Sequence, residues 1–367
     1  MKIRLLCNAL HIAVAVIAMF LLLPGEVSAA TATPHGWPWR GVVLEGVATP
    51  EDIKKLAGGG ANSVAILLSP RTWAIRQKLT PQQAWQYSLN YADTILDACR
   101  SYGMTGILSI SQIPTDPASG LGQESREFWE NPAKLQEANN IASSLAQHFH
   151  TRGKELAAYE ILNEPLIREG SKVEKPKAWH GLVQTMVKEI RQFDPNRFIV
   201  VTLSMGGMPS GYTDAQPLSD KHIVYGAHMY MPHAYTHQGV GDWQKRDITY
   251  PGIINLRYWD VDTLENAMSP LISFQEKYHV PVWIGEFSAL RWAPNSNQYL
   301  SDLIDVFEKY GWSWSYFSYN GFHGWNPSCD EVFNSDNCPG DNTPRWQLLK
   351  RKFLKSPPGT KVPASRG

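Results

Sequence analysis

The stretch ELAAYEILNEP, residues 155–165, is the part of the chain that decides the fold class and the chemistry together. It starts as an apolar run typical of a buried strand and ends on an asparagine, a glutamate and a proline. It holds two glutamates, Glu160 and Glu164. Because charged side chains are rarely buried without a partner, an acid directly after such a strand raises the question of whether a second carboxylate faces it.

Seven further strand-like runs accompany this one, and helical patterns lie between most of them. The runs cover 41–46, 63–69, 105–111, 197–204, 222–230, 280–288 and 312–319. Apolar residues recur at helical spacing over 81–102, 133–150, 177–193, 261–278 and 298–310. The connection after residue 204 is rich in Gly, Pro and Ser, which predicts a short or irregular segment.

Strands that alternate with helices predict parallel strands joined by crossovers. Eight such units predict an α/β fold with a single domain, a (β/α)₈ TIM barrel, whose active site lies at the carboxyl ends of the strands. An open doubly wound sheet is the alternative. Neither GxGxxG nor GxxxxGK[ST] follows the first strand, which disfavours the open sheet.

The two ends of the chain differ from the middle. Residues 1–30 begin with Lys2 and Arg4, continue with an apolar run and end on small residues, a pattern typical of a cleaved signal peptide. An uncleaved membrane anchor is the alternative, because the run approaches the ~20 residues that a spanning helix needs. We therefore predict a secreted or periplasmic protein with a single (β/α)₈ domain over 31–354 and a disordered tail over 355–367.

Composition narrows the function classes. The chain has 34 acidic and 34 basic residues, so it offers no basic patch for nucleic acid. Aromatic residues are plentiful, with 14 Trp, 15 Tyr and 12 Phe. These rings suit either a large core or stacking against flat ligands.

The cysteines fit an oxidising compartment. Cys329 and Cys338 bracket the polar loop CDEVFNSDNC, which predicts a disulfide. Cys99 lies in a helical pattern and is expected to be a buried free thiol. Cysteines so far apart do not form a zinc site.

Two glutamates stand at corresponding ends of barrel strands. Glu164 follows the fourth strand and Glu286 the seventh, and these ends face each other across the mouth of a closed eight-stranded barrel. Cleavage of a glycosidic bond needs such a pair: one carboxyl protonates the leaving oxygen, and the other attacks the sugar or activates water. A surface-loop or ion-pair role would explain either glutamate alone, but the matched placement favours catalysis.

Three short motifs add a resemblance to this reading. They are NEP at 163–165, HMY at 228–230 and GEF at 285–287. In this order and at these strands they resemble glycoside hydrolase family 5, the cellulase-like members of a clan of retaining (β/α)₈ glycosidases. The resemblance spans about residues 36–350 and is most specific at NEP.

The resemblance implies roles for individual residues. Glu164 would be the acid/base and Glu286 the nucleophile of a double displacement through a covalent glycosyl–enzyme, with no cofactor. Asn163 would hydrogen-bond the sugar 2-hydroxyl. His228 would line the reactive subsite, and Tyr230 would lie near the nucleophile.

The chain also departs from the family pattern, which makes it a divergent member. Ala65 stands where the family usually has an arginine on the second strand, and Arg71 is a candidate substitute. Ser111 or Gln112 occupies the usual histidine position on the third strand. Phe317 occupies the position of the subsite tryptophan on the eighth strand.

Other side chains receive supporting roles. Strand alternation places Glu160, Leu162 and Glu164 on one side, so we expect Glu160 to face the barrel interior and brace the site. Trp292 and Trp325 follow the seventh and eighth strands, where an indole face can stack on sugar.

No metal site is expected. His233 and His237 lie four apart but lack a helix and an acidic third ligand, so a loop flanking the sugar groove is the better interpretation. The acids between 330 and 341 do not match the spacing of a twelve-residue calcium loop. No serine lies in a GxSxG elbow, which weighs against an esterase.

We therefore predict an exported, retaining β-glycoside hydrolase that acts as a monomer on a polysaccharide or oligosaccharide of β-glucan or β-mannan type. Long segments after the sixth and eighth strands favour endo action. The alternatives are an exo-acting β-glycosidase or transglycosylase, and a catalytically weak carbohydrate-binding barrel. A structural envelope protein is disfavoured by the paired glutamates.

Overall fold

The computed structural model describes residues 32–45, 48–115, 122–170, 172–203 and 205–354. The predicted signal peptide and carboxyl-terminal tail lie outside the described residues. No helix in the described ranges is both long enough and apolar enough to cross a membrane.

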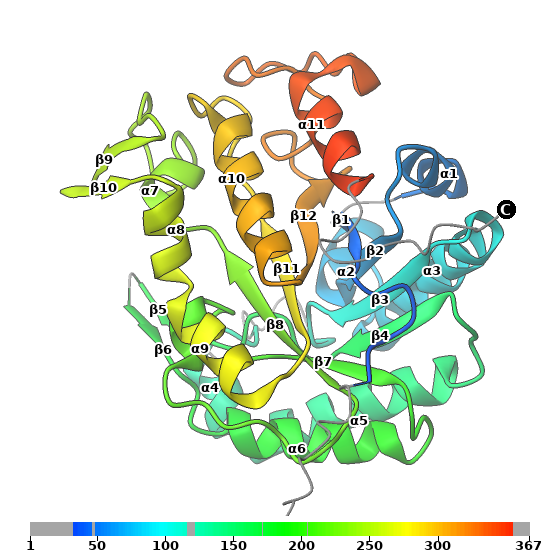
Figure 1. The fold of residues 1–367 in the computed structure, drawn as a ribbon. Helices are drawn as coiled ribbons and strands as arrows, with labels where there is room; N and C mark the ends of the chain where they lie inside the picture. Colours follow the sequence, from blue (N-terminus) through cyan, green and yellow to red (C-terminus); the bar gives the residue numbers. More distant parts are fainter. Residues whose placement is uncertain (1–31, 46–47, 116–121, 171, 204, 355–367) are drawn as a thin grey trace, which may run out of the picture. The chain divides into compact units, whose positions relative to one another are not determined.

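Eight parallel strands close into a barrel, as predicted (Figure 1). Around the barrel the order is β1-β12-β11-β8-β7-β4-β3-β2. In chain order these strands are β1 (Arg40–Leu44), β2 (Ser63–Leu68), β3 (Thr105–Ile110), β4 (Leu156–Glu160), β7 (Phe198–Thr202), β8 (Ile223–Met229), β11 (Val282–Phe287) and β12 (Ser313–Tyr319). Each of the eight predicted runs overlaps one of them, so the (β/α)₈ prediction is confirmed.

Helices surround the barrel and connect its strands. They are α1 (Pro50–Gly58), α2 (Pro70–Gln77), α3 (Pro81–Tyr102), α4 (Arg126–Glu130), α5 (Pro132–Phe149), α6 (Trp179–Arg191), α7 (His233–Thr236), α8 (Val261–Ala267), α9 (Ser269–Tyr278), α10 (Ser296–Lys309) and α11 (Pro344–Phe353). The predicted helix 261–278 is two helices, because Pro270 near the start of α9 lacks the N–H that a continuous helix would use. The irregular connection expected after residue 204 contains one short 3₁₀ turn, η2 (Pro209–Tyr212).

Local sequence signals set the helix ends. In α3, the Thr80 hydroxyl accepts a hydrogen bond from the backbone N–H of Gln83. The side-chain oxygen of Gln83 in turn accepts one from the backbone N–H of Thr80. This reciprocal capping box satisfies two N–H groups that the first turn leaves free. Gly103 ends the helix at φ 69°, a left-handed conformation that glycine adopts without a side-chain clash.

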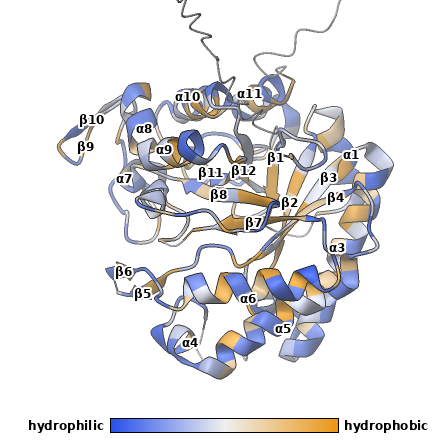
Figure 2. Ribbon diagram, turned by 60° about the horizontal axis from the view of Figure 1, so that its bottom comes forward, coloured by the Kyte–Doolittle hydropathy of each residue, from blue (hydrophilic) through white to orange (hydrophobic). Residues whose placement is uncertain are grey.

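The core has two layers. Inside the barrel, Trp39, Val43, Ile107, Val200 and Trp283 pack together with other inward side chains. A larger apolar layer lies between the strands and the helices. Strands buried on both faces read as continuous apolar runs rather than alternating ones, and Figure 2 shows hydrophobic strands beside helices that carry both hydrophilic and hydrophobic residues.

Two hairpins were not expected from the sequence. β5 (Ile167–Glu169) pairs with β6 (Lys172–Glu174) after barrel strand β4, and β9 (Gly252–Ile254) pairs with β10 (Arg257–Trp259) after β8. Each strand has three residues, which is too short for an alternating pattern to be recognised. Both hairpins extend segments that follow the carboxyl ends of barrel strands.

Candidate active site

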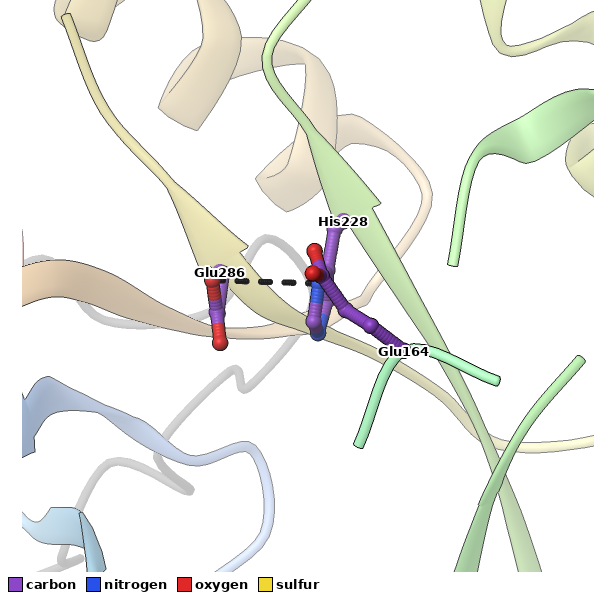
Figure 3. A group of neighbouring side chains, drawn as sticks. All are labelled: Glu164, His228 and Glu286. Atoms are coloured by element: carbon purple, nitrogen blue, oxygen red, sulfur yellow. Dashed lines mark hydrogen bonds and ion pairs between the residues drawn. The ribbon is translucent and has the colours of Figure 1, made fainter. Parts of the chain in front are cut away.

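The two predicted catalytic glutamates meet at the carboxyl ends of the strands. Glu164 lies four residues beyond the end of β4, and Glu286 is the second-last residue of β11. Glu286 pairs in register with His228 of β8. Figure 3 shows the three side chains converging, with the carboxyl of Glu164 beside the His228 ring and Glu286 facing them.

Gly285 makes this convergence possible. The register between β11 and β8 shifts between Ile284 and Glu286, so the strand is irregular at the glycine. A Cβ at Gly285 would lie 3.0 Å from the Trp283 ring and 3.3 Å from His228 Nε2. A larger residue would therefore push on the imidazole that contacts both carboxyls.

The carboxyls are close together. One carboxylate oxygen of Glu164, one of Glu286 and one ring nitrogen of His228 all lie within 4.8 Å of one another. His228 Nδ1 is 2.8 Å from Glu164 Oε1 and 3.8 Å from Glu286 Oε2. A single imidazole therefore faces both acids.

The two glutamates have different surroundings. Glu286 is 7% exposed, and its two oxygens accept hydrogen bonds from Asn163 Nδ2 at 3.0 Å and from the Tyr230 hydroxyl at 2.8 Å. The side chain of Glu164 is 38% exposed. Donors that hold both oxygens favour an ionised, fixed Glu286, whereas Glu164 stands at the rim, where it can exchange a proton with solvent.

Burial and charge shift the acids and the imidazole in a coupled way. Burial raises the pKa of Glu286 to about 7; the charge of Glu164 adds to this, and His228, Asn163 and Tyr230 oppose it. Burial lowers the pKa of His228, but the carboxylates of Glu286 and Glu164 outweigh that effect and raise it to about 9. His228 is therefore a cation at neutral pH and supports the ionised form of its neighbours.

Glu160 lies inside the barrel, beneath this group. It is 1% exposed and accepts a hydrogen bond from the Thr202 hydroxyl at 2.7 Å. Burial raises its pKa above the ordinary range. The alternation argument does not extend to Leu162 and Glu164, because β4 ends at Glu160 and both later residues have positive φ, 59° and 50°.

Three adjoining cavities form a cleft across the strand ends, and Glu164 lines all of them. Their volumes are about 510, 590 and 660 Å³, and Glu286 lines the second and third. Asn163, Ser111 and Gln112 line the first two, whereas Tyr230 and Trp325 line the third.

The structure shows where Ala65 and Arg71, two residues at which the chain departs from the family pattern, lie relative to Glu286. Ala65 is 1% exposed inside the barrel core, and its methyl side chain supplies no charge to Glu286. Arg71 lines the first cavity, which Glu286 does not line. Among the described residues, Glu286 has Asn163, Tyr230 and His228 as its polar partners, so Arg71 does not replace the missing arginine in direct contact.

The predicted aromatic residues separate into two groups. Phe317 and Trp325 line the cleft beside Tyr230, with ring centroids 6.2 Å from it. Trp292 does not line any of the three cavities. Its indole N–H donates to the Gln238 carbonyl at 2.8 Å and its ring packs on Phe333 at 5.0 Å, so its position is that of a packing residue.

Sequence reasoning missed one acid in the cleft. Glu45 follows β1 and lines the second cavity together with Glu286. It accepts hydrogen bonds from the Ser318 hydroxyl at 2.6 Å and from the Phe322 N–H at 3.2 Å. Its place directly after the first strand was the available signal, since the strand-end rule that selected Glu164 applies equally to it.

The catalytic group also has the composition of a metal site, because two carboxylates and an imidazole are close enough to share an ion. However, Asn163 and Tyr230 donate to both oxygens of Glu286, and His228 Nδ1 faces Glu164. The ligand atoms are thus engaged with protein donors. This arrangement suits proton transfer and nucleophilic attack.

The cysteines pair as predicted: Cys329 and Cys338 form a disulfide in the loop after β12, and Cys99 is a buried free thiol. Burial raises the pKa of Cys99 to about 12, so the thiol stays protonated.

Comparison with known proteins extends these observations. The model of the cellulase family, glycosyl hydrolase family 5, matches residues 29–323. Endoglucanase C of Acetivibrio thermocellus is 24% identical over 73% of this chain and 83% of its own length. Cellodextrinase A of Ruminococcus flavefaciens is 22% identical over 73% and 77%.

The fold is shared with solved structures. Thermotoga maritima Cel5A, solved in complex with cellobiose, superposes with a TM-score of 0.66 at 19% identity, covering 86% of this chain and 97% of that one. Since the family model matches most of the chain, this chain belongs to glycosyl hydrolase family 5, the cellulase family, and is an O-glycosyl hydrolase.

Proposed function

We propose that the protein is an exported, retaining, endo-acting hydrolase of β-glucan chains. The observation that supports retention is the distance between the acids, since Glu164 and Glu286 have carboxylate oxygens within 4.8 Å. Retaining glycosidases hold their carboxyl groups ~5–5.5 Å apart, whereas inverting ones leave ~6.5–9.5 Å for a water molecule.

In the first step, the Glu286 carboxylate attacks the anomeric carbon while Glu164 donates its proton to the leaving oxygen. The glycosidic bond breaks, and an ester between Glu286 and the sugar forms. In the second step, Glu164 removes a proton from water, whose oxygen attacks the same carbon and releases Glu286. The greater exposure of Glu164 fits an acid that must be reprotonated in every cycle.

The surrounding residues prepare this chemistry. Asn163 donates to Glu286 through Nδ2, while its buried Oδ1 has no partner among the described residues. That oxygen can accept a hydrogen bond from the sugar 2-hydroxyl. Tyr230 fixes the other oxygen of Glu286, and His228 supplies positive charge between the two acids.

Substrate choice rests on the relatives and on the cleft. Relatives named endoglucanase and cellodextrinase support a β-glucan substrate. Three cavities that share Glu164 in their lining support binding within a chain rather than at its end. Ala65 and Ser111 favour the second candidate, a catalytically weak carbohydrate-binding barrel, because the usual cation and imidazole are absent from those positions.

Hydrolysis is tested by release of reducing ends from β-glucan, β-mannan and xylan by the chain from residue 31 onward. We expect activity on β-glucan with a rapid fall in viscosity, as endo action requires. Glu286→Gln should lose activity by roughly a thousandfold or more, because the nucleophile is removed. Glu169→Gln, at an exposed position in β5, is the matched control and should retain activity.

The mechanism is tested with a 2-deoxy-2-fluoro-β-cellobioside that bears a good leaving group. The intact protein should gain one cellobiosyl mass, and the label should be found on Glu286. NMR of the first product should show the β-anomer. An α-anomer as first product would contradict retention, and glycan binding with no product from the native protein would favour the binding-barrel candidate.

Export and the domain boundaries are part of the proposal. The full chain produced in a bacterium with the general secretory pathway should appear outside the cytoplasm with a new amino terminus near residue 31. Recovery in the membrane fraction with residues 1–30 intact would indicate the anchor instead. Sedimentation of the mature chain should give a monomer.

A further inference from the structure

The cavity of about 510 Å³ contains a charged side chain that the proposed mechanism does not use. Arg71, the second residue of α2, lines this cavity and is partly buried. Among the described residues, its guanidinium has no hydrogen-bond or ion-pair partner. Arginine inside a cleft typically pairs with a carboxylate or phosphate. Arg71 is therefore a binding group that the protein itself leaves available.

The two glutamines of the same cavity are engaged with the protein. The side-chain oxygen of Gln112 accepts from the Thr72 N–H at 3.0 Å, and its amide donates to the Thr72 hydroxyl at 3.1 Å. The side-chain oxygen of Gln123 accepts from the Ile113 N–H at 3.3 Å, and its amide donates to the Ser111 carbonyl. These contacts fix the wall around Arg71, and a fixed wall lowers the ordering cost of binding.

The charges that line the cavity leave one positive charge uncompensated. Arg168 lies 3.2 Å from Glu124 through Nε and Oε2, so these two form an ion pair. Glu164 holds a proton at the start of the proposed cycle and is then neutral. The remaining charge is that of Arg71, and it favours an anionic group of the ligand.

The shape of the cavity suits a polar substituent rather than the face of a sugar ring. A Cβ at Gly122 would lie 3.0 Å from Arg71 Nη1, so the glycine leaves room for the guanidinium. No aromatic ring is among the described residues that line this cavity. Tyr230, Phe317 and Trp325 instead line the cavity of about 660 Å³. Stacking on sugar faces therefore belongs to that part of the cleft.

The cavity opens onto the bond that is cleaved. Ser111, Gln112, Asn163 and Glu164 line both this cavity and the one of about 590 Å³, which Glu286 also lines. Glu164 must reach the glycosidic oxygen to protonate it. A substituent that enters the cavity therefore belongs to one of the two sugar units that this oxygen joins.

We propose that Arg71 binds a carboxylate carried by a sugar unit at the cleaved bond, so that the preferred substrate is an acidic β-glycan containing uronic acid units. This inference rests on the proposed function, because it assigns the proton donor to Glu164. A guanidinium presents a planar fork that pairs with both oxygens of a carboxylate. One unpaired arginine matches this single charge, whereas a phosphate monoester carries about −1.5 to −2 near neutral pH.

The test is an internal competition between two hexasaccharides, cellohexaose and its derivative with one internal glucuronate. The ratio of their kcat/KM values should favour the acidic substrate by about tenfold in the native protein. Mass spectrometry should find the glucuronate at a chain end created by cleavage. Arg71→Met should bring the ratio close to one and change kcat/KM on cellohexaose by less than threefold.

Two further variants at the same position and one control separate a specific site from general electrostatics. Arg71→Lys keeps the charge without the fork and should retain part of the preference. Arg71→Glu should favour the neutral substrate, because it repels the carboxylate. Arg351→Met removes the same charge at an exposed arginine of α11 that lines none of the three cavities, and it should keep the native ratio.

Binding provides a readout that does not need turnover. In a Glu286→Gln background, calorimetry should show tighter binding of the acidic hexasaccharide, and Arg71→Met should abolish the difference. Equal use of both substrates by the native protein, or a preference that survives in Arg71→Met, would overturn the carboxylate site while hydrolysis of cellohexaose stands. A native protein that prefers the acidic ligand through Arg71 but cleaves neither substrate would refute the proposed hydrolysis and leave the site standing.

Discussion

At the scale of single residues, the reaction centre depends on an unusual backbone at the end of β4. Leu162 and Glu164 have φ of 59° and 50°, in the left-handed region that residues other than glycine rarely adopt. Between them, the backbone N–H of Asn163 donates to the Ile110 carbonyl of β3 at 2.9 Å. The strain is located where the carboxyl of Glu164 must project over the barrel, as functional sites often show.

The coupling between the acids and His228 predicts opposite pH shifts in two variants. Glu286 must be ionised to attack, so kcat/KM should fall as pH drops below its pKa of about 7. Glu164→Gln removes a negative neighbour and should move this acidic limb about one unit lower. His228→Gln removes a positive neighbour and should move it higher.

The measurement is kcat/KM against pH with a 2,4-dinitrophenyl β-cellobioside, whose leaving group needs no proton. Shifts in the same direction for both variants would contradict the electrostatic account.

Asn163 gives a second residue-scale prediction. Asn163→Ala removes the hydrogen bond to Glu286 Oε1 and the free Oδ1 that awaits a sugar hydroxyl. A hydrogen bond to a charged group contributes about 1.5–3 kcal/mol, so kcat/KM should fall by roughly 10- to 100-fold. The fall should be much smaller on a 2-deoxy glycoside, which lacks the hydroxyl. Equal falls on both substrates would limit Asn163 to positioning Glu286.

At the scale of elements, the loop 320–343 that follows β12 is organised around one buried guanidinium. Arg291 has a fully buried side chain and donates to the carbonyls of His323 and Val332, at 2.9 and 3.0 Å, and to the Asp330 carboxylate at 3.0 Å. The disulfide closes the same loop. Because this loop presents Trp325 to the cleft, we expect its order to affect substrate binding.

Arg291→Met should therefore disturb both stability and binding. Buried carbonyls that lose their donor cost about 1–3 kcal/mol each, so the free energy of unfolding should fall by about 3 kcal/mol or more, with a higher KM for β-glucan. Denaturant unfolding and steady-state kinetics measure the two effects. Arg257→Met, at an exposed arginine of β10, is the control. An unchanged KM in a destabilised Arg291→Met variant would show that the order of this loop does not affect substrate binding.

At the scale of the whole molecule, the barrel closes where its first and last strands pair, β1 with β12. Arg40 of β1 forms two hydrogen bonds of 2.6 Å with Glu308 of α10, which also accepts from Trp314 Nε1 of β12 at 2.9 Å. The side chains of this pair are 7% and 10% exposed. The contact ties the start of the barrel to its final unit.

Breaking this pair from one side should be costly. Arg40→Met leaves the Glu308 charge buried and should lower the free energy of unfolding by about 3–5 kcal/mol. The double variant Arg40→Met/Glu308→Met should recover much of the loss, since no unpaired charge remains. The exposed pair Lys54–Glu51 serves as control, and Lys54→Met should cost less than ~1 kcal/mol. If denaturant unfolding showed similarly small losses in the free energy of unfolding at both pairs, Arg40 would not contribute to the closure of the barrel.

The order of elements and the pair of glutamates that meets at the strand ends were available from the chain itself. Parallel strands that are buried on both faces have continuous apolar sequences, and capping residues such as Thr80 indicate where helices begin. The rule that active sites lie at the carboxyl ends of barrel strands selects Glu164 and Glu286. What the sequence could not supply depends on side chains from distant segments meeting. The strands of the two hairpins have three residues each, which is too short to show an alternating pattern. Trp292 follows the predicted strand, but its ring packs on Phe333 of the loop after β12.

The sequence by itself determined the (β/α)₈ class and singled out the two glutamates that meet in the structure, because periodicity and strand ends are local properties. Only the tertiary structure decided that His228 contacts both acids, that Glu45 lines the cleft, and that the rings from Tyr230 to Trp243 form one row. These facts depend on distances between groups far apart along the chain, and closure of the barrel is what sets those distances.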